Sequence, residues 1–404
     1  MQLRNESLNS PFYQRKVWPT RLGIHFLFVS TFAMLGGALR GFNLLLVVAG
    51  ILVGALMIQW RWSRGAVMAL SLRRRLPSEA YVGKAFSLDF EVTNHSRWMI
   101  LWLLRVDDRV ESQASLSPGK ANSNLSSATI HQIGPSQVAS KTTYIVPQNR
   151  GTLTFGPLRV FTSFPLDLLT ARVINKQSET LEVYPKLLTL KRGWQRFITG
   201  RNDGVSGSTD RTGPNEGEFY GLRPYRDGDT VRKIHWRTSA RLDQPVVAQY
   251  EQSRRYEMCV IVEAFLESPT SPNERVEMAI SAAATIAMRL AGGASSRIVV
   301  AAAGQQPMAT LASGSTDTKR NVLSLLSRVQ VTHSPDLLGA FEQASELGGR
   351  FQDFLVLSPR SMQQAIQAGD PEMRSRLDQW LRRGGLRWID LSAAGGSDWF
   401  EVTE

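Results

Sequence analysis

The chain has 404 residues, which is too long for one ordinary domain, and a formal net charge of +12. Residues 1–75 hold ten Lys or Arg and one acid, and this placement favours a membrane anchor over a surface for nucleic acid. The single cysteine, Cys259, excludes an intrachain disulfide framework and a Cys-based metal site, and it is compatible with a reducing, cytoplasmic location.

Two apolar segments, residues 22–39 and 42–58, contain no Lys, Arg, Asp or Glu. Each is close to the roughly 20 residues that cross about 30 Å of hydrocarbon. The short connection Arg40-Gly41 predicts a helical hairpin, and the Lys and Arg counts around it predict that both termini are cytoplasmic. A cleaved signal peptide is the competing interpretation. It is disfavoured because no Ala-x-Ala-like site follows the first segment and a second segment begins at once.

Tryptophans flank the two apolar segments. Trp18 precedes the first segment, and Trp60 and Trp62 follow the second. Indole rings are favoured at the level of the lipid headgroups, so these residues are expected at the membrane surface, with membrane lipid as a partner of the chain. His25 is interpreted as an interfacial residue rather than a functional group inside the membrane.

The next part of the chain has strand patterns. Residues 84–93 alternate between apolar and polar side chains, which predicts a half-buried strand, and residues 98–106 are its expected antiparallel partner. Residues 111–128, rich in Ser, Asn and Ala, are interpreted as an exposed loop. Further short strands are expected at residues 139–146, 152–155, 158–162 and 180–184. Short strands separated by Pro and Gly predict an all-β sandwich over residues 72–190 that binds or positions rather than catalyses.

A polar stretch follows. Residues 193–217 lose periodicity and fill with Gly, Asn, Asp and Ser, which marks a loop. Residues 218–241, EFYGLRPYRDGDTVRKIHWRTSAR, then interleave charged and aromatic side chains without a helical or strand period. The arginines offer forked donors for carboxylate or phosphate, and Asp229 and Glu218 supply acceptors within the chain.

Three interpretations of residues 218–241 stay open. The first is an internal network of ion pairs and hydrogen bonds that fastens two soluble domains together, and the second is a partner-binding surface. The third is catalysis, with Asp229 orienting His235 as a general base, although Ser239 lacks the surroundings of a nucleophile. Nucleic-acid binding is disfavoured because acidic residues are interleaved throughout the stretch.

The C-terminal part alternates strand and helix patterns. Residues 258–262 form a continuous apolar run, typical of a strand covered on both faces, and residues 273–290 show one apolar helical face. Further strands are expected at residues 297–302, 354–357 and 386–391, and further helices at residues 317–329 and before Gly384-Gly385. This order predicts an α/β domain with a parallel sheet and right-handed crossovers.

The apolar hairpin, residues 150–169 (RGTLTFGPLRVFTSFPLDLL) and above all residues 218–241 resemble the bacterial family called domain of unknown function 58. The motif residues are Phe219, Gly221, Arg223, Tyr225, Gly228, Asp229, Arg232, His235, Trp236 and Arg241. The resemblance covers nearly the whole chain. It implies a membrane hairpin, a β-sandwich and a C-terminal domain similar to the von Willebrand factor A domain. It also implies a MoxR-type AAA ATPase as partner, and it attaches no firm reaction to the family.

A-type domains build a metal site from Asp-x-Ser-x-Ser after the first strand, a Thr in a later loop and an Asp at a further strand end. Here the first element falls on residues 263–267, where Glu263 is retained but Phe265 and Glu267 replace the two hydroxyls. Thr332 or Ser334 stands for the loop hydroxyl, and Pro359 occupies the position expected for Asp. Because Mg²⁺ prefers near-ideal octahedral oxygen coordination, the resemblance predicts a degenerate site and no Mg²⁺ cofactor.

The predicted organisation has five parts: a cytoplasmic N-terminal segment (1–21), a transmembrane hairpin (22–60), a β-sandwich (72–190), a basic connector (191–255) and a von Willebrand factor A-like α/β domain (256–404). The predicted function is a membrane-anchored, non-enzymatic scaffold or adaptor at the bacterial inner membrane. It is expected to engage a MoxR-type AAA ATPase or a cell-envelope assembly partner from the cytoplasmic side. The alternative is a hydrolase using Asp229 and His235 in a cleft between the domains.

Overall fold

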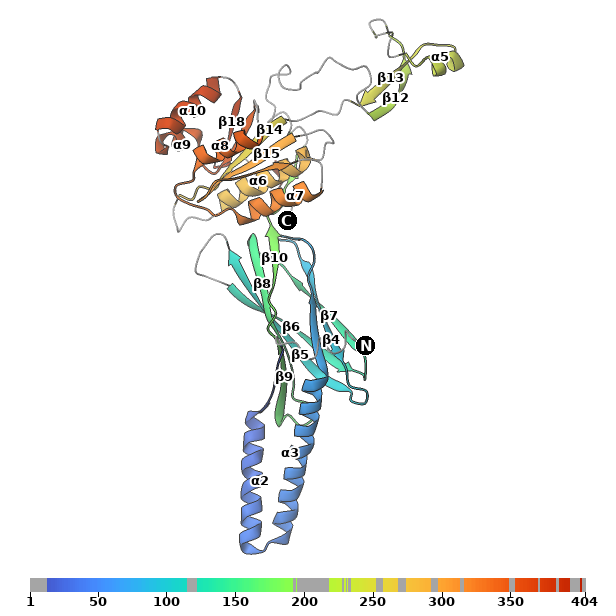
Figure 1. Cartoon of the computed structure of the whole chain (residues 1–404), viewed down its shortest axis with the longest axis vertical. Coiled ribbons are helices and arrows are strands. Elements are labelled where there is room, and N and C mark those ends of the chain that lie inside the picture. The colour runs from blue at the N-terminus through green and yellow to red at the C-terminus, as the bar shows by residue number, and fades with distance from the viewer. Residues whose placement is uncertain are drawn as a thin grey trace. The chain divides into compact units, whose positions relative to one another are not determined.

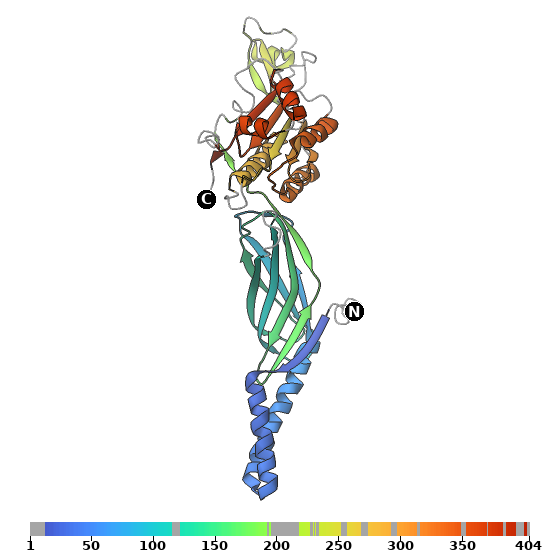
Figure 2. The same cartoon turned by 90° about the vertical axis from the view of Figure 1, so that its left-hand side faces the viewer.

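The computed structural model of the chain describes residues 13–114, 122–191, 194, 218–226, 229, 231, 234–251, 257–267, 274–291, 297–312, 316–348, 353–369, 371–382, 385–392 and 400–401. The chain divides into two compact units, Met1–Tyr184 and Pro185–Glu404 (Figures 1 and 2). The first unit contains two long helices and a β domain. The second contains an α/β domain and a small hairpin with one short helix.

Two apolar helices, α2 (Arg21–Arg40) and α3 (Asn43–Ala69), run side by side in the first unit (Figures 1 and 2). Gly41 ends α2 with φ 66°, a left-handed conformation that favours glycine, and the chain reverses there. Both helices are long and apolar enough to cross a membrane. The predicted hairpin of two apolar helices is therefore confirmed, while α3 continues to Ala69, well past the predicted end of the second segment.

The C-terminal half of α3 is hydrogen-bonded to the β domain. Gln59 is fully buried, and its Nε2 donates to the carbonyl oxygens of Ser163, Phe164 and Leu169 at 3.2, 3.2 and 3.3 Å. Its Oε1 accepts a hydrogen bond from the Leu166 amide at 3.0 Å. This single side chain thus satisfies several backbone groups in residues 163–169. Helix α3 then passes directly into the strand that begins at Leu70.

The β domain consists of two sheets. The larger sheet is mixed but mainly antiparallel and has seven strands. Five of them pair in the order β1-β9-β8-β10-β3, β5 also pairs with β8, and β6 pairs with β5. Its strands are β1 (Tyr13–Pro19), β3 (Ala80–Tyr81), β5 (Leu101–Ala114), β6 (Asn122–Ile133), β8 (Gly151–Thr162), β9 (Leu169–Asn175) and β10 (Glu179–Tyr184). The antiparallel sheet β2-β4-β7 consists of β2 (Leu70–Arg75), β4 (Phe86–Asn94) and β7 (Val138–Ile145).

Both sheets contribute side chains to one hydrophobic core. Leu88 and Phe90 from β4 pack with Leu104 from β5 and with Phe155 and Val160 from β8, and all five are fully buried. These residues alternate along their strands with more exposed ones, as expected when one face of each sheet is buried.

A buried ion pair joins the two sheets. Arg74 Nη1 on β2 lies 2.7 Å from Asp108 Oδ2 on β5, and the Arg74 guanidinium carbon lies 5.4 Å from the ring centroid of Phe155. Burial raises the pKa of Asp108 from its ordinary value, and the charge of Arg74 opposes this shift.

Several predictions about strands are corrected. Strand β4 pairs with β2 and β7, whereas the stretch predicted to be its partner forms β5, which pairs with β6 and β8. Alternation identifies a strand but not its neighbour. Residues 111–128 are not one exposed loop, because β5 extends to Ala114 and β6 starts at Asn122, and the two pair through their backbones.

Two further corrections concern the N-terminal segment and the strand at residues 151–162. The predicted N-terminal segment contains β1, which pairs with β9 across a long sequence separation. The two strands expected at 152–155 and 158–162 are one strand, β8, which passes through Gly156 with φ 125°.

The α/β domain of the second unit is built on a five-stranded sheet of order β16-β15-β14-β17-β18, in which β16 alone is antiparallel to its neighbour. The strands are β14 (Glu257–Glu263), β15 (Arg297–Ala303), β16 (Met308–Ala312), β17 (Phe354–Ser358) and β18 (Leu386–Asp390). The helices are α6 (Glu274–Leu290), α7 (Thr316–Arg328), α8 (Leu337–Gly348), α9 (Met362–Ala368) and α10 (Pro371–Arg382). The predicted α/β pattern with parallel strands is present. Strand β16 and helix α8 were not predicted, and two helices, α9 and α10, occupy the segment where one was expected.

Helices pack on the sheet through a continuous apolar layer. Cys259 and Ile261 of β14 share one core cluster with Phe341 of α8 and Leu377 of α10. Val260 of β14 is equally buried, and it points to the opposite face because side chains alternate along a strand. Helix α6 contacts β14, β15, β17 and α7. A central strand buried on both faces explains the continuous apolar run in its sequence.

The rest of the second unit is a small hairpin with one helix. Strands β12 (Glu218–Pro224) and β13 (Val246–Glu251) pair in antiparallel fashion, and the short helix α5 (Trp236–Leu242) lies between them in the chain. Residues 218–241 therefore contain regular structure that the sequence did not indicate. Strands β11 (Thr189–Leu190) and β19 (Phe400–Glu401) form a separate two-stranded ladder.

Candidate functional site

The hairpin of β12, β13 and α5 holds most of the motif residues. The ladder runs from the Glu218 and Glu251 pair to the Pro224 and Val246 pair, with an irregularity between Phe219 and Gly221. Tyr225 continues it, since its amide donates to the Pro245 carbonyl at 2.9 Å. Gly228 and Arg232 lie outside the described residues, as does the side chain of Phe219.

Arg223 and Asp229 form a bidentate ion pair at the end of β12. Arg223 Nη1 donates to Asp229 Oδ2 and Nη2 donates to Oδ1, both at 2.6 Å. The Arg226 amide also donates to Asp229 Oδ2 at 2.9 Å, which closes a turn. The Arg223 guanidinium, and after it the Arg226 amide, lower the pKa of Asp229 to about 2. The carboxylate is therefore ionised at neutral pH and directed toward its own hairpin.

His235 caps helix α5. Its Nδ1 lies 2.8 Å from Thr238 Oγ1, and it accepts a hydrogen bond from the Thr238 amide at 3.3 Å. The hydrogen bonds of Asp229 and His235 go to different residues, so the described geometry does not contain the Asp229–His235 hydrogen bond that a general base would require. The His235 side chain is also exposed.

Ser239 has a structural role in this hairpin. Its hydroxyl donates to the His235 carbonyl at 3.0 Å and accepts from the Val246 amide at 2.9 Å. The side chain is buried and fastens α5 to β13. A nucleophile would need a base at its hydroxyl, and Ser239 has backbone groups there instead.

The same hairpin exposes large apolar and basic side chains. Trp236 is 63% exposed, although tryptophan is commonly buried. We define the connector surface as the exposed apolar and basic side chains of this hairpin: Leu222, Arg226, Val231, Trp236, Arg237, Arg241 and Leu242. Tryptophan and arginine are the residues that most often carry binding energy in protein interfaces.

A second cluster lies at the carboxyl ends of β14 and β17. Glu263, the last residue of β14, is completely buried. Its Oε2 accepts from the Ser358 hydroxyl at 2.5 Å, and its Oε1 lies 2.5 Å from Arg360 Nη2. Arg360 Nε also approaches both carboxylate oxygens, at 3.2 and 3.3 Å. The only cation that the described residues place beside this buried carboxylate is thus an arginine of the same chain.

Phe265 and the chain after β17 hold Arg360 in place. The guanidinium carbon lies 3.9 Å from the ring centroid of Phe265, which is a cation–π geometry. The Arg360 amide donates to the Ser358 hydroxyl at 3.0 Å, and the Arg360 carbonyl accepts from Trp388 Nε1 at 3.0 Å. The bend through Pro359 carries the chain from β17 to Arg360.

Thr332 lies next to this cluster through its backbone. It forms a parallel bridge with Phe265. The Thr332 amide donates to the Ala264 carbonyl at 3.0 Å, and the Thr332 carbonyl accepts from the Leu266 amide at 2.9 Å. Its hydroxyl accepts from the Ser334 amide at 3.3 Å. The structure thus brings Glu263, Phe265, Thr332 and Pro359 to one end of the sheet, whereas the Glu267 side chain is exposed.

The donor set here is a poor fit for Mg²⁺. Its one buried carboxylate is already neutralised by Arg360, and a divalent cation at that point would meet the guanidinium charge at close range. Among the described residues, no group of three or more His, Cys, Asp or Glu side chains is placed to share a metal ion.

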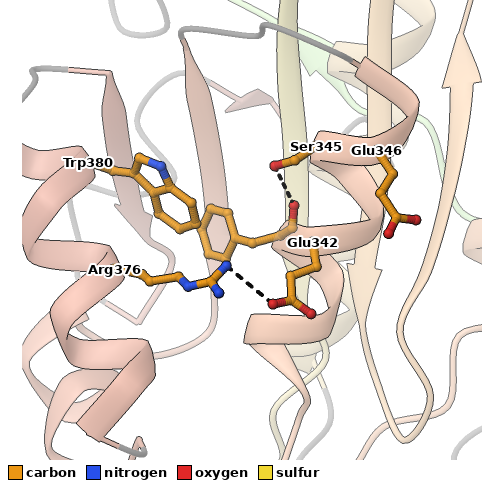
Figure 3. A pocket seen from close by; sticks show the side chains of 6 residues that line it. Glu342, Ser345, Glu346, Arg376 and Trp380 are labelled. Carbon is orange, nitrogen blue, oxygen red and sulfur yellow. Dashed lines mark hydrogen bonds and ion pairs between the residues drawn. The ribbon is translucent and has the colours of Figure 1, made fainter.

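A surface hollow of about 400 Å³ lies between α8 and α10. Phe341 and Trp380 line it with ring centroids 4.4 Å apart, and Arg376 Nη1 bonds Glu342 Oε1 at 3.2 Å (Figure 3). The Ser345 hydroxyl donates to the Phe341 carbonyl of its own helix at 2.8 Å. These contacts build a helix–helix junction, and none supplies an activated nucleophile.

Sequence reasoning missed Arg360. The signal was present, because a buried acid at the end of one parallel strand requires a partner, and the strands that end beside it are the place to find one. Arg360 follows β17, the neighbour of β14, by two residues. Comparison of strand ends identifies it without any motif.

The fold and these clusters define a class of protein: two apolar N-terminal helices, a β domain, and an α/β domain whose strand-end carboxylate is paired with an arginine. Residues 221–367 match the family described as "Protein of unknown function DUF58". Over these residues, the match confirms the family resemblance predicted from the motif.

A curated relative is similar over part of the chain. "Uncharacterized protein YeaD" of Bacillus subtilis (strain 168) is 31% identical over 121 residues, which cover 29% of this chain and 29% of that protein. The chain thus spans less than a third of the length of this relative.

Solved structures show only low similarity. The CARDB domain of PF1109 from Pyrococcus furiosus covers 28% of this chain and 94% of its own, at 12% identity and a TM-score of 0.19. A beta-glucosidase from Listeria innocua covers 28% of this chain and 16% of its own, at 13% identity and the same TM-score. These likenesses are too low to carry an argument about this chain.

Proposed function

We propose that this chain is a membrane-anchored, non-enzymatic scaffold or adaptor of the bacterial inner membrane. Helices α2 and α3 cross the bilayer, and both termini and all folded domains lie in the cytoplasm. The connector surface binds a protein partner, either a MoxR-type AAA ATPase or a component of cell-envelope assembly.

The architecture supports this proposal in two ways. Two sheets around a common core are typical of a β-sandwich, a fold that presents surfaces for binding. The strand order β16-β15-β14-β17-β18 with one antiparallel edge is compatible with a von Willebrand factor A-like domain. We assign a β-sandwich fold to the β domain and a von Willebrand factor A-like fold to the α/β domain.

The connector surface is the observation that carries the proposal. Trp236 and Leu242 lie exposed on α5, and Arg237 and Arg241 are exposed on the same helix. Asp229 is neutralised by Arg223, and the exposed Asp243 offsets only one of the three exposed arginines, so the described side chains of the connector surface carry a net positive charge. Apolar anchors surrounded by arginines fit a partner with an apolar groove and acidic flanks.

The strand-end cluster supports a non-enzymatic role without Mg²⁺. Glu263 is held by Arg360 and Ser358, so its lone pairs are occupied within the domain. We infer that partner binding by this chain does not require a metal ion at the strand ends of the α/β domain.

The test is co-purification. The detergent-solubilised full chain is mixed with a MoxR-type ATPase from the same genome, in ADP and in a non-hydrolysable ATP analogue, and analysed by size-exclusion chromatography. We expect co-elution in at least one nucleotide state. Because interface hot spots cost roughly 2 kcal/mol or more on truncation, Trp236→Ala is expected to weaken binding about 30-fold or more.

Tyr144→Ala is the matched control, because Tyr144 is an exposed aromatic residue of the β domain, on β7, outside the connector surface. It is expected to leave the affinity unchanged. If the unsubstituted chain does not associate in either nucleotide state, the ATPase is not the partner. Equal loss from both substitutions would show that the connector surface is not the binding site.

A further inference from the structure

The end of the β domain next to α2 and α3 exposes large apolar side chains. Trp18, at the end of β1, is 70% exposed, and Trp98, in the loop between β4 and β5, is 91% exposed. Leu166, in the loop between β8 and β9, is exposed as well. Phe164 of that loop lies with its ring centroid 6.2 Å from Trp62 and 6.0 Å from Trp102. We call this set the rim: Trp18, Trp62, Trp98, Trp102, Phe164 and Leu166.

Contacts with α3 give the level of the rim along the helix. Gln59 bonds the β8–β9 loop, so this loop lies level with residue 59. A Cβ added to Gly65 would lie 2.9 Å from Met99 Cε, so the β4–β5 loop lies level with residue 65. At 1.5 Å per residue, about 30 Å of hydrocarbon starting at Asn43 ends about 20 residues later, near Trp62. The two loops therefore bracket the boundary between hydrocarbon and headgroups.

Both loops are held firmly at this level. The Gln59 side chain fixes the β8–β9 loop, and the Asn94 side chain donates to the Met99 carbonyl at 2.7 Å and to the Gly134 carbonyl at 3.0 Å. Asn94 is completely buried. Because α3 passes into β2 without a linker, the β domain cannot rise away from the bilayer that α3 crosses.

The charges around the rim favour an anionic lipid surface. Arg61 and Arg64 on α3 and Arg97 beside Trp98 are exposed, and the Arg64 guanidinium carbon lies 5.4 Å from the ring centroid of Trp60. The acid in the β8–β9 loop, Asp167, is placed next to the N-terminus of α2, where Thr20 Oγ1 donates to its carbonyl at 2.5 Å. The Asp167 side chain is exposed, and the three exposed arginines outnumber it.

We propose that the rim is a lipid-contacting surface that seats the β domain on the anionic phospholipid headgroups of the bilayer. The inference rests on the proposed membrane anchoring and adds that the β domain itself, through Trp98 and Leu166, enters the headgroup region. Lipid is the occupant because the rim is continuous with the apolar surface of α2 and α3. Tryptophan and arginine are also the residues favoured at that depth.

The test measures the depth of single sites. The full chain carries one added cysteine, at Leu166→Cys, Trp98→Cys or Arg97→Cys, labelled with a fluorescent probe. The native Cys259 is buried, so the unsubstituted chain serves as the labelling blank. The protein is reconstituted in vesicles of phosphatidylcholine and phosphatidylglycerol that contain lipids spin-labelled at the headgroup or in the acyl chain.

Two further sites are the controls. Val146→Cys lies at the opposite end of the β domain, next to the Pro147–Gly83 hydrogen bond, and Phe32→Cys lies on the exposed surface of α2. We expect headgroup-labelled lipid to quench the rim probes at least about twofold more than the Val146→Cys probe, because the rim lies at headgroup depth. Acyl-chain labels are expected to quench the Phe32→Cys probe.

The two proposals fail differently. If the Phe32→Cys probe is quenched but the rim probes behave like the Val146→Cys probe, the rim is not a lipid surface and the anchoring stands. If the Phe32→Cys probe is also unquenched, the proposed anchoring fails and the rim proposal fails with it. Arg97→Cys is the second reporter for its loop should Trp98→Cys not fold.

Discussion

At the scale of single residues, Glu263 is an acid at the end of β14 whose side chain is completely buried. An ionised carboxylate without a partner is very unfavourable in such surroundings, and Arg360 and Ser358 provide the partners. A buried pair of this kind adds little net stability over apolar residues of the same shape, but the removal of one partner leaves a buried charge behind. The pair should therefore show strong coupling.

Glu263→Gln tests this coupling. We expect the free energy of opening of the sheet to fall by about 3–5 kcal/mol, since Arg360 is left buried without its counter-charge. Combined replacement with Glu263→Leu and Arg360→Met should cost less than the sum of the two single changes. Hydrogen exchange of the amides of β14 and β17 at increasing urea measures the opening of this sheet by itself.

The exposed pair of Glu342 and Arg376 is the matched control in the same domain, with an Oε1–Nη1 distance of 3.2 Å and about half of each side chain in solvent. Glu342→Gln is expected to change the same free energy by no more than about 1 kcal/mol. Similar effects at the two sites would contradict the coupling of Glu263 to Arg360.

At the scale of elements, the junction between α2 and the β domain is very close. A Cβ at Gly23 would lie 1.9 Å from the carbonyl oxygen of Leu168, which only glycine avoids. In this position the Leu168 carbonyl accepts from the Thr20 amide at 3.0 Å, at the start of α2. The β8–β9 loop is therefore held between the start of α2 and Gln59 of α3.

Gly23→Ala is expected to lower the thermal stability of the β domain in detergent, by about 1–3 kcal/mol in the free energy of unfolding, because the loop must move. Gly50→Ala in α3 is the control. A Cβ there has no neighbour within 4 Å, and alanine favours the helix, so this change is expected to be neutral or slightly stabilising. Differential scanning calorimetry distinguishes the two, and an unchanged Gly23→Ala melting temperature would refute the close contact.

The sequence predicted elements where one local pattern suffices. The helices were visible because nothing charged interrupts residues 22–39 and 42–58, and β14 because its run is entirely apolar. Strand partners were not visible, since β1 pairs with β9 through backbone groups that carry no sequence signal. The stretch YQRKVWP of β1 is too short and too charged to be recognised alone.

The candidate site was predictable to a similar degree. The Arg223–Asp229 pair lies within six residues of sequence, and its charges were recognised as internal partners. The pair of Arg360 and Glu263 joins residues 97 positions apart, so it appears only when β14 and β17 are known to be neighbours. The exposure of Trp236 likewise depends on which other segments cover α5, and the sequence of α5 alone does not predict them.

At the scale of the whole molecule, the distribution of charge predicts the orientation. Residues 1–75 account for nine of the twelve net positive charges, and all of their Lys and Arg except Arg40 come before residue 22 or after residue 58 in the sequence. Positive residues are retained in the cytoplasm during insertion, so we expect a phosphatase reporter after Glu404 to be inactive and a fluorescent protein there to be bright. The same phosphatase inserted after Gly41, in the turn between α2 and α3, should be active. An active phosphatase after Glu404 would place the domains outside the cell membrane, away from any cytoplasmic ATPase, and would refute the proposed adaptor role as well as the orientation.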